Sequence, residues 1–459
     1  MSETVFMEDL PLRKFHFRVV LAGGGGQFSD GFILGIIGIA VSIAAKPMHL
    51  DAMWLGLIAA AALAGIFLGS ICTGPFADRF GRRGIFAYDM IAFAAISAAQ
   101  YFVTAPWQLL VFRVALGFIL GADYAVGKSL VVEYLPRRFR GSMTSMLAVC
   151  WGSGYVLSYY IGYLIQSFNP EGWRLMLAVS GIPALLILPL RLGIPESPMW
   201  LLKRKREKDA AAIVRETFGS NVVMDNSPAA RETTQHTGMS SLFSRGMRRN
   251  TFVGCVFFTC QVIPYFALGT FSPRILQALH VGNGFMAAMV YNALLICGTL
   301  VGVAIIDRIP RRSFLVTAFY ASAAALAALA LVNGSAAFTI AAFGVFACIL
   351  SASTTLEPVY TAELFPTELR ATGAGFVIAC SRIGSASATF LLPLAVQHIG
   401  IKASLLFCVG TLVVGGVICQ MLAPETRNKK LAEVANGNEA ATRSDGSYYN
   451  STSSAQASD

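Results

Sequence analysis

The chain has 459 residues, of which 55% are hydrophobic and only 13% charged, and it carries a net charge of +10. Because charged residues normally make up about a quarter of a globular chain, this composition excludes an ordinary soluble protein. The Lys and Arg residues stand in short runs between apolar segments rather than on a basic face interleaved with aromatic residues, so nucleic-acid binding is not expected either.

Apolar segments recur along the chain at the length needed to cross a bilayer. A crossing takes about 20 residues as a helix, which is the only single segment that satisfies its own backbone in lipid. We predict an all-α membrane protein with 12 spans: 19–45, 52–75, 84–104, 107–134, 142–168, 173–193, 251–276, 285–306, 313–333, 336–360, 371–399 and 401–423.

The segments outside these spans define the predicted domains. Residues 1–18 form a cytoplasmic N-terminal segment with no cleavable signal, and 19–193 form the first six-helix bundle. The charged stretch 194–250 is a cytoplasmic linker with a short surface helix around Trp200–Phe218. The second bundle is 251–423, and 424–459 is a cytoplasmic tail, rich in Ser, Asn and Ala, that we expect to be disordered from about residue 436.

The distribution of Lys and Arg predicts the orientation. On the side that holds both termini lie 27 of them, against 4 on the opposite side, and the remaining 4 fall within spans. Positive loops stay in the cytoplasm. Both termini are therefore predicted to be cytoplasmic.

The two halves of the sequence repeat each other. The run Asp78–Arg83 after the second span returns as Asp307–Arg312 after the eighth, 229 positions later, and Pro195-Glu196-Ser197 returns as Pro424-Glu425-Thr426 at the same offset. Glu133 and Glu363 differ by 230 positions. Two similar halves of six helices each are typical of transporters that rock around a central site.

Neither a metal nor an organic cofactor is expected. The nine cysteines lie inside apolar segments without a CxxC pair, and the five histidines lie at span ends or in loops. A membrane enzyme, which needs a convergent nucleophile, metal site or His pair, is a weaker hypothesis for the same reason. The run Gly23–Gly26 lacks the strand and GK[ST] of a phosphate loop and is interpreted as helix packing.

The fourth span carries the most unusual pattern. Charges inside a span normally face a partner or a water-filled path, because lipid does not tolerate them. When the residues are placed on a helix that turns 100° per residue, charged residues and glycines fall along one stripe of an otherwise apolar surface. Such a stripe indicates the wall of a polar cavity. The stripe consists of Arg113, Gly117, Gly121, Tyr124 and Lys128.

Several motifs resemble one known family. The run Gly74–Arg83 is similar to the loop signature of the major facilitator superfamily, and Pro195–Leu201 and Pro424–Thr426 are similar to signatures of its sugar-porter branch. Gly121–Tyr124 and the pair Asp30-Gly31 look more like proton-coupled metabolite symporters of bacteria. The resemblance covers most of residues 19–430. It implies two six-helix bundles, alternating access and a bacterial inner membrane.

The sequence also departs from the sugar-porter pattern. Met199 stands where sugar porters usually carry Arg, and the seventh span, around Cys260–Tyr265, lacks the double Gln and the downstream polar pair of hexose carriers. A glucose transporter is therefore not expected. The resemblance favours symport of a proton with a small polar or anionic metabolite, such as a sugar acid, an organic or aromatic carboxylate, or a sugar.

Three residues are candidates for proton coupling. Asp30 lies near the middle of the first span, where a carboxylate can be neutral when desolvated and ionised beside a cation. By resemblance, it would pair with Arg113 when ionised and release it when protonated; the alternative is a permanent structural ion pair. Asp123 matches a carboxylate that handles proton or substrate in phosphate-type symporters, and a helix-packing hydrogen bond is the alternative.

Substrate contacts are predicted mainly from cations near the midplane. The guanidinium of Arg382 favours carboxylate or phosphate, although it could instead pair with Glu357. Lys128 could face the cavity or extend toward the cytoplasm. The full predicted set of substrate-binding residues is Arg382, Gln261, Tyr124, Lys128, Trp151, Tyr155, Tyr159, Tyr265 and Glu357.

Ion-pair latches at the cytoplasmic ends of the helices are implied by the same resemblance. Such pairs and helix dipoles can favour one state of a carrier, whereas a plain topology signal is the alternative. The residues are Gly74, Asp78, Arg79, Gly81, Arg82, Arg83, Glu133 and Arg140, mirrored by Asp307, Arg308, Glu363 and Arg370.

The sequence therefore predicts a secondary active transporter, not an enzyme, with the proton as coupling ion. Its predicted partners are a small-molecule substrate and the bilayer, without nucleic acid, and a monomer is expected. A uniporter or exporter of the same family, a membrane enzyme and a channel are the alternatives. Flux that is insensitive to the proton gradient would favour a uniporter or exporter. Measurable conductance would favour a channel.

Replacing Asp30 with Asn tests the coupling hypothesis. An amide cannot carry the transported proton, so we expect Asp30→Asn to abolish uphill uptake while counterflow exchange of substrate continues. Uptake against a gradient at the wild-type level in this variant would refute the role of Asp30.

Overall fold

The computed structural model describes residues 5–224, 239–244, 246–282, 284–306, 308–332, 334–365 and 369–426. Helices fill the predicted spans. The first half contains α1 Lys14–Ala44, α2 Ala52–Phe80, α3 Arg83–Ala99, α4 Pro106–Tyr134, α5 Arg137–Phe168, α6 Trp173–Val179 and α7 Ile182–Leu192. The second half contains α11 Arg248–Thr270, α12 Ser272–Ala278, α13 Gly284–Ile305, α14 Arg311–Leu331, α15 Ala336–Thr354, α16 Leu356–Glu363, α17 Arg370–Ile399 and α18 Ile401–Leu422.

Eleven helical segments in the described part of the chain are long and apolar enough to cross a membrane, and each coincides with a predicted span. Three-residue or shorter breaks inside the sixth and tenth spans separate α6 from α7 and α15 from α16. The remaining predicted span, 142–168, lies in α5, which is 32 residues long and packs along α1. Ser, Gly and Tyr residues make α5 less apolar than the others. Its neighbours, rather than lipid, receive these polar positions.

Glycines let pairs of helices approach until backbones touch. A Cβ added at Gly154 of α5 would lie 2.0 Å from the carbonyl oxygen of Phe28 in α1, and one at Gly117 of α4 would lie 2.1 Å from that of Ala62 in α2. In the second half, a Cβ at Gly298 of α13 would lie 2.2 Å from the carbonyl oxygen of Cys348 in α15. Small residues are the usual means of close helix packing in membranes.

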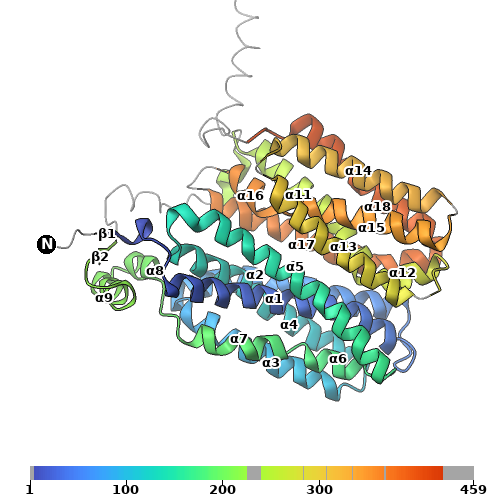
Figure 1. Cartoon of the computed structure of the whole chain (residues 1–459), viewed down its shortest axis with the longest axis horizontal. Helices are drawn as coiled ribbons and strands as arrows, with labels where there is room; N and C mark the ends of the chain where they lie inside the picture. The colour runs from blue at the N-terminus through green and yellow to red at the C-terminus, as the bar shows by residue number, and fades with distance from the viewer. Residues whose placement is uncertain are drawn as a thin grey trace, which may run out of the picture.

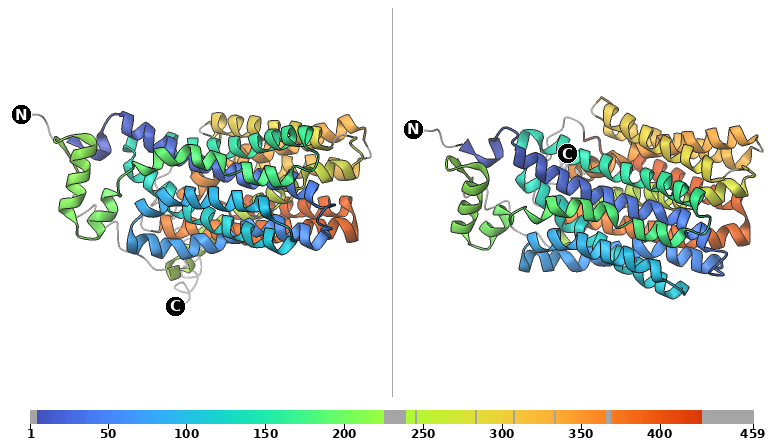
Figure 2. Two further views of the ribbon diagram at one scale, coloured as in Figure 1. Left: turned by 90° about the horizontal axis from the view of Figure 1, so that it is seen from below. Right: turned by 60° about the horizontal axis from the view of Figure 1, so that its bottom comes forward.

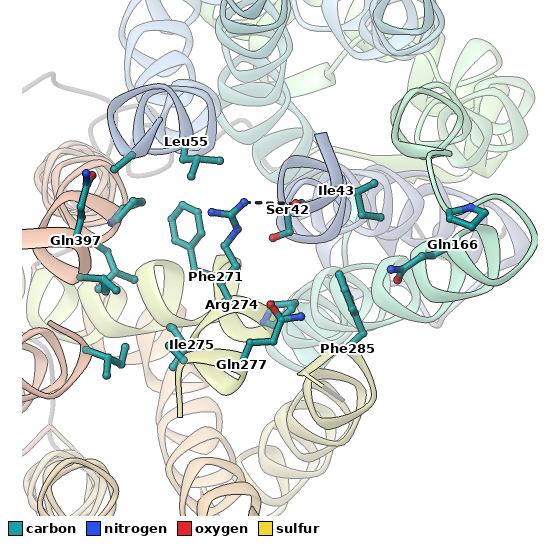
Figure 3. Close-up of a pocket in the computed structure, with 18 residues that line it drawn as sticks. Ser42, Ile43, Leu55, Gln166, Phe271, Arg274, Ile275, Gln277, Phe285 and Gln397 are labelled. Atoms are coloured by element: carbon teal, nitrogen blue, oxygen red, sulfur yellow. Dashed lines mark hydrogen bonds between the residues drawn. The ribbon is translucent and has the colours of Figure 1, made fainter. Parts of the chain in front are cut away.

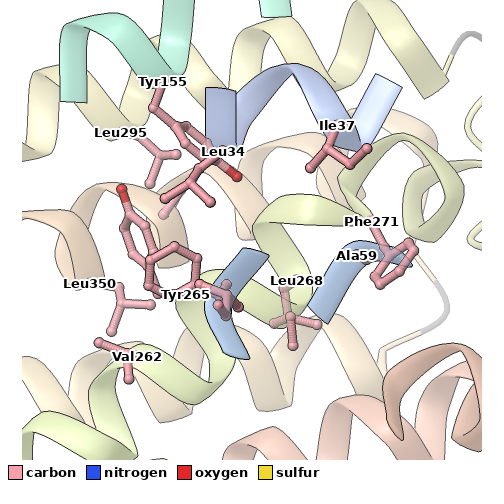
Figure 4. Close-up of a cluster of buried hydrophobic side chains, with 14 of the residues drawn as sticks. Leu34, Ile37, Ala59, Tyr155, Val262, Tyr265, Leu268, Phe271, Leu295 and Leu350 are labelled. Carbon is pink, nitrogen blue, oxygen red and sulfur yellow. The ribbon is translucent and has the colours of Figure 1, made fainter. Parts of the chain in front are cut away.

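The two halves lie side by side as two bundles, the first coloured blue to green and the second yellow to red (Figure 1). They contact each other through α1 with α11 and α12, α2 with α17, and α5 with α13. One cluster of buried apolar side chains continues from one bundle to the other. Tyr155 of α5 and Tyr265 of α11 face each other in this cluster, with ring centroids 6.3 Å apart (Figure 4).

The end of the molecule that carries the N-terminus also carries the linker elements, as all views show (Figures 1 and 2). The predicted surface helix is in fact two helices, α8 Pro198–Lys203 and α9 Glu207–Phe218. Lys205 between them adopts a positive φ of 59°, which no helix continues through. The tail beyond residue 426, including its predicted disorder, and linker residues 225–238 lie outside the described part.

The N-terminal segment pairs with the linker. Strand β1, Val5–Phe6, runs parallel to β2, Val222–Val223, and Arg13 donates a hydrogen bond to the carbonyl of Phe218 at the end of α9. The start of α1 is thereby tied to the linker at the cytoplasmic face.

The α1–α5 contact can be tested with one methyl group. We expect Gly154→Ala to lower the free energy of unfolding by about 1–3 kcal/mol, because the methyl group meets backbone that cannot move aside alone. The matched control is Gly410→Ala in α18, where an added Cβ has nothing within 4 Å. Denaturant unfolding in detergent measures both, and equal stability of the two variants would contradict the packing described here.

Candidate functional site

Two cations from opposite bundles approach one aromatic ring. The Nζ of Lys128, one turn along α4 from Tyr124, lies 4.7 Å from the centroid of the Tyr124 ring. The Cζ of Arg382, on α17 of the other bundle, lies 5.7 Å from the same centroid and 5.5 Å from that of Phe266 in α11. Cations are attracted to ring faces at such distances. Tyr124 therefore joins the polar surfaces of the two bundles.

Further aromatic side chains surround this point. Trp151 and Tyr155 of α5 stack with ring centroids 5.5 Å apart, and Trp151 lies 6.2 Å from Tyr265 and 6.1 Å from Phe266 of α11. We call Tyr124, Lys128, Trp151, Tyr265, Phe266, Glu357 and Arg382 the central site. The sequence analysis predicted all of these residues except Phe266. Phe266 is an apolar residue next to the predicted Tyr265, and nothing in the sequence marks it as part of a site.

The polar members of the central site keep partial solvent exposure although they lie deep in long helices. Tyr124, Lys128, Trp151, Glu357 and Arg382 are all half-buried. Ring contacts and cation–ring contacts bring the aromatic and cationic side chains together at the interface of the two bundles. Glu357 of α16 lies within electrostatic range of Lys128 and Arg382. No ion pair joins Glu357 to Arg382 in the described part of the chain, so the predicted alternative pairing is not formed.

Several buried polar atoms at the interface of the bundles have no hydrogen-bond partner within the described part of the chain. They are the indole nitrogen of Trp151, the hydroxyl of Tyr155, the Oε1 of Gln261 and the Nε of Arg382. The amide nitrogen of Gln261 donates to the hydroxyl of Ser353 at 2.6 Å, which fixes its orientation. Buried polar groups are normally satisfied. This set therefore offers both donors and acceptors to a bound molecule.

Tyr159 has a different position from the other predicted substrate residues. It is buried, and its hydroxyl donates a hydrogen bond of 2.7 Å to the carbonyl of Gly269 at the end of α11. This bond joins the bundles. A Cβ added at Gly38 of α1 would lie 2.4 Å from both this hydroxyl and the carbonyl oxygen of Thr270. Tyr159 thus closes the extracytoplasmic side rather than lining the central site.

Asp30 and Arg113 are both fully buried in the first bundle but do not form an ion pair in the described structure. The Oδ2 of Asp30 accepts a hydrogen bond from the amide of Gln27 at 3.1 Å, and its Oδ1 has no partner. Arg113 donates to the carbonyl of Ile33 at 3.3 Å, while its Nε and Nη2 have none. The permanent structural pair is therefore wrong for this conformation; the coupling role stays a prediction.

Asp123 has a partner that the sequence did not suggest. Its Oδ1 and Oδ2 accept from Nη1 and Nη2 of Arg191, on α7, at 2.8 and 3.1 Å. The same Nη1 lies 2.9 Å from the Oδ2 of Asp89 on α3. All three side chains are almost completely buried. We call Asp89, Asp123 and Arg191 the buried triad.

The surroundings of the triad are shaped for the guanidinium. The Nε of Arg191 donates to the carbonyl of Ala22 at 3.2 Å, and the Cζ of Arg191 lies 4.1 Å from the ring centroid of Phe86. A Cβ at Gly26 would lie 1.6 Å from its Nη2, so only glycine leaves room for Arg191. Arg191 and Asp89 are ionisable residues within predicted spans, and that signal alone marks both as candidates.

The latches are hydrogen-bonded within each bundle and repeat with the sequence. Glu133 accepts from the guanidinium of Arg82 and from the hydroxyl of Ser197; in the second bundle, Glu363 accepts from Thr426 at 2.5 Å and pairs with Arg311 at 3.6 Å. Ser197, Thr426 and Arg311 were not predicted. The suggested partners Arg140 and Arg370 have side chains outside the described part, as does Asp78, and Asp307 lies wholly outside it.

A second carboxylate holds each latch loop through its backbone. Glu196 accepts from the backbone N–H groups of Arg82 and Arg83 at 3.0–3.1 Å, and Glu425 from those of Arg311 and Arg312 at 2.9 and 3.0 Å. Gly81 permits this approach with a φ of +99°, because a Cβ there would lie 2.4 Å from Glu196. The carbonyl of Arg79 accepts from Arg204 of the linker at 2.7 Å. Gly74 lies inside α2 and Arg308 just after α13.

Comparison with known proteins agrees with this architecture. Residues 27–437 match the family model described as Sugar (and other) transporter. The inner membrane metabolite transport protein YgcS of Escherichia coli is 39% identical over 95% of this chain and 97% of its own. The niacin transporter NiaP of Acinetobacter baylyi is 29% identical over 93% and 98%. The xylose transporter XylE of Escherichia coli, in a partially occluded inward-open conformation, superposes with a TM-score of 0.76 at 18% identity, covering 91% of this chain and all of that one.

The buried triad can be tested as a structural unit. We expect Arg191→Met to lower the free energy of unfolding by about 3–5 kcal/mol, because it leaves two carboxylates buried without a cation. The triple variant Asp89→Asn, Asp123→Asn, Arg191→Met removes the charges together and should recover part of that loss. Unfolding in detergent measures all three proteins; a single variant as stable as the wild type would contradict the pairing.

Proposed function

The chain belongs to the sugar (and other) transporter family of the major facilitator superfamily, and from this premise we propose that it imports a small carboxylate together with a proton. The observation that carries the proposal is the convergence of Lys128 and Arg382, from opposite bundles, on the ring of Tyr124. Two half-buried cations near one aromatic ring favour an anion. The flanking aromatic rings favour an anion with a flat or apolar body.

The free hydrogen-bonding capacity of Arg382 supports a carboxylate. Among the described residues, its Nε has no hydrogen-bond partner and no ion pair joins it to Glu357. A guanidinium binds a carboxylate through two parallel bonds, and it gains most where water is excluded. The relative NiaP is named for niacin, itself an aromatic carboxylate. An aromatic monocarboxylate is therefore the first substrate class to test.

Proton coupling is supported by the geometry around Asp30. Its Oδ1 is buried without a hydrogen-bond partner, and a bare carboxylate oxygen in such a place is costly unless a proton occupies the group. Arg113, also incompletely bonded, is the cation available when the proton leaves. No cofactor enters this scheme, in which a monomer carries one substrate at a time.

The arrangement of the bundles supports alternating access. The described bonds that join the bundles, from Tyr159 to Gly269 and from Arg274 to the carbonyl of Ser42 at 3.4 Å, lie toward the extracytoplasmic end, whereas both latches bond within their own bundle. We interpret this conformation as closed to the outside. Opening to the outside requires the Tyr159–Gly269 bond to break.

Uptake into proteoliposomes tests the proposal. We expect radiolabelled nicotinate or benzoate to accumulate when the lumen is alkaline, and accumulation to stop when a protonophore removes the gradient. Glucose and phosphate tested in parallel should show little uptake. Uptake that only equilibrates, with or without the gradient, would favour a uniporter instead.

Arg382→Lys separates a bidentate contact from a mere positive charge. We expect it to weaken apparent affinity for the carboxylate by about tenfold, roughly 1.4 kcal/mol, because an ammonium cannot form the paired bonds. Lys402→Arg, in the first turn of α18 at the extracytoplasmic end, is the control for a neutral exchange between these cations. Unaltered affinity in Arg382→Lys would remove the argument for a carboxylate at this residue.

A further inference from the structure

A cavity of about 680 Å³ lies at the extracytoplasmic end, away from the central site (Figure 3). Small-molecule sites commonly have volumes of roughly 300–1,000 Å³. The cavity is lined from both bundles: Ser42 and Gln166 come from α1 and α5, and Arg274, Gln277 and Gln397 come from α12 and α17. A molecule bound here would contact both moving parts of the carrier.

The closed side of the transporter separates this cavity from the central site. The hydrogen bond from Tyr159 to Gly269 and the close approach of Gly38 to Thr270 lie between the two. Phe271 and Arg274 follow immediately in the chain and line the cavity. The cavity is thus on the outer face of the closure, and a ligand from outside reaches it without entering the central site.

The lining has the chemistry of an amphipathic anion site. Arg274 supplies a positive charge, and its guanidinium, pointing toward Ser42, makes one long hydrogen bond of 3.4 Å to that carbonyl (Figure 3). Among the described lining residues none is acidic. The Oε1 of Gln166 is buried without a partner and can accept a hydrogen bond. The remaining surface is largely apolar, including Phe271 and Phe285.

We propose that this cavity is a second, regulatory site for a small carboxylate with an apolar body. The carboxylate binds Arg274, and the apolar body fills the space between the bundles. Since opening to the outside must pull the two walls apart, the bound molecule holds the carrier closed to the outside. This inference uses the alternating access of the proposed function but not its substrate.

Ligand-induced stabilisation of the purified full chain tests the proposal, with 4-butylbenzoate as probe and uncharged 4-butylbenzamide as its matched control. We expect 4-butylbenzoate to raise the melting temperature of the wild type and of Arg382→Gln, in which the central site is impaired, and to leave the double variant Arg382→Gln, Arg274→Gln unchanged. The amide should have at most a small effect on any of the three, because it lacks the charge that Arg274 binds.

The pattern of responses decides between the two sites. A shift lost in Arg382→Gln and kept in Arg274→Gln would mean that the probe binds centrally, which overturns the proposal, as does no shift in the wild type. Val396 of α17 also lines the cavity, and Val396→Trp fills the cavity without altering its charge. Combined with Arg382→Gln, it should also lose the response, and it serves if Arg274→Gln does not fold. A full shift in this combined variant would place the probe elsewhere and contradict the assignment.

In proteoliposomes, the same probe added outside should lower the maximal rate of uptake by the wild type but not by Arg274→Gln, whatever its effect on the KM of the transported substrate. Inhibition of the wild type that is wholly overcome by more substrate would show competition at the central site alone and would contradict a separate outer site. Failure of the proposed function would instead appear as absence of uptake in the wild type, while the stabilisation by the probe remained measurable.

Discussion

An ionised side chain inside a membrane bundle needs a partner, and this requirement distinguishes scaffold from working parts in this protein. Arg191 meets it completely: two carboxylates, backbone carbonyls and an aromatic ring surround its guanidinium. Arg113 and Arg382 meet it only in part, since within the described part of the chain the Nε and Nη2 of Arg113 and the Nε of Arg382 are buried without acceptors. A fully paired charge stabilises one packing arrangement, whereas an incompletely paired one can exchange partners during a transport cycle.

The positions of these two kinds of residue follow the architecture. The buried triad connects α3, α4 and α7 within one bundle and leaves it rigid. The central site is instead divided between bundles, with Lys128 on α4 and Arg382 on α17. A molecule bound there contacts both bundles at once, so its binding energy can act on their relative position.

The duplication of the chain is visible in the hydrogen bonds as well as in the sequence. Tyr134 donates to the carbonyl of Glu196 at 2.9 Å. In the second bundle, Tyr360, about one turn before the position that repeats Tyr134, donates to the carbonyl of Pro424 at 2.7 Å. Together with the two carboxylate latches, this places the same loop geometry at the cytoplasmic end of each bundle. Similar latches suit halves that move as rigid bodies.

The fold was predictable from the sequence because its signals are local. Apolar length sets the spans, Lys and Arg set their orientation, and the recurring Asp-Arg and Pro-Glu motifs reveal the repeat. Among the predicted spans in the described part of the chain, α5 is the one that falls below the apolarity of a lipid-facing span, because it carries several Ser, Gly and Tyr residues.

The site was predictable only in part, since pairing between helices depends on three-dimensional packing. Lys128 and Arg382 were identifiable as cations within spans. That Asp123 pairs with Arg191 depends on the space left by Gly26, which the sequence shows only as one glycine among four. Glu133 and Arg82 were both assigned to a latch, but that these two pair with each other depends on packing, because Arg82 lies 51 residues away in the loop before α3.

An experimental structure with nicotinate or benzoate bound tests the central claim most directly. The account predicts density between the bundles, with the carboxylate against Arg382 and Lys128 and the ring against Tyr124 and Trp151. A ligand bound within one bundle, or with its carboxylate distant from both cations, would contradict it.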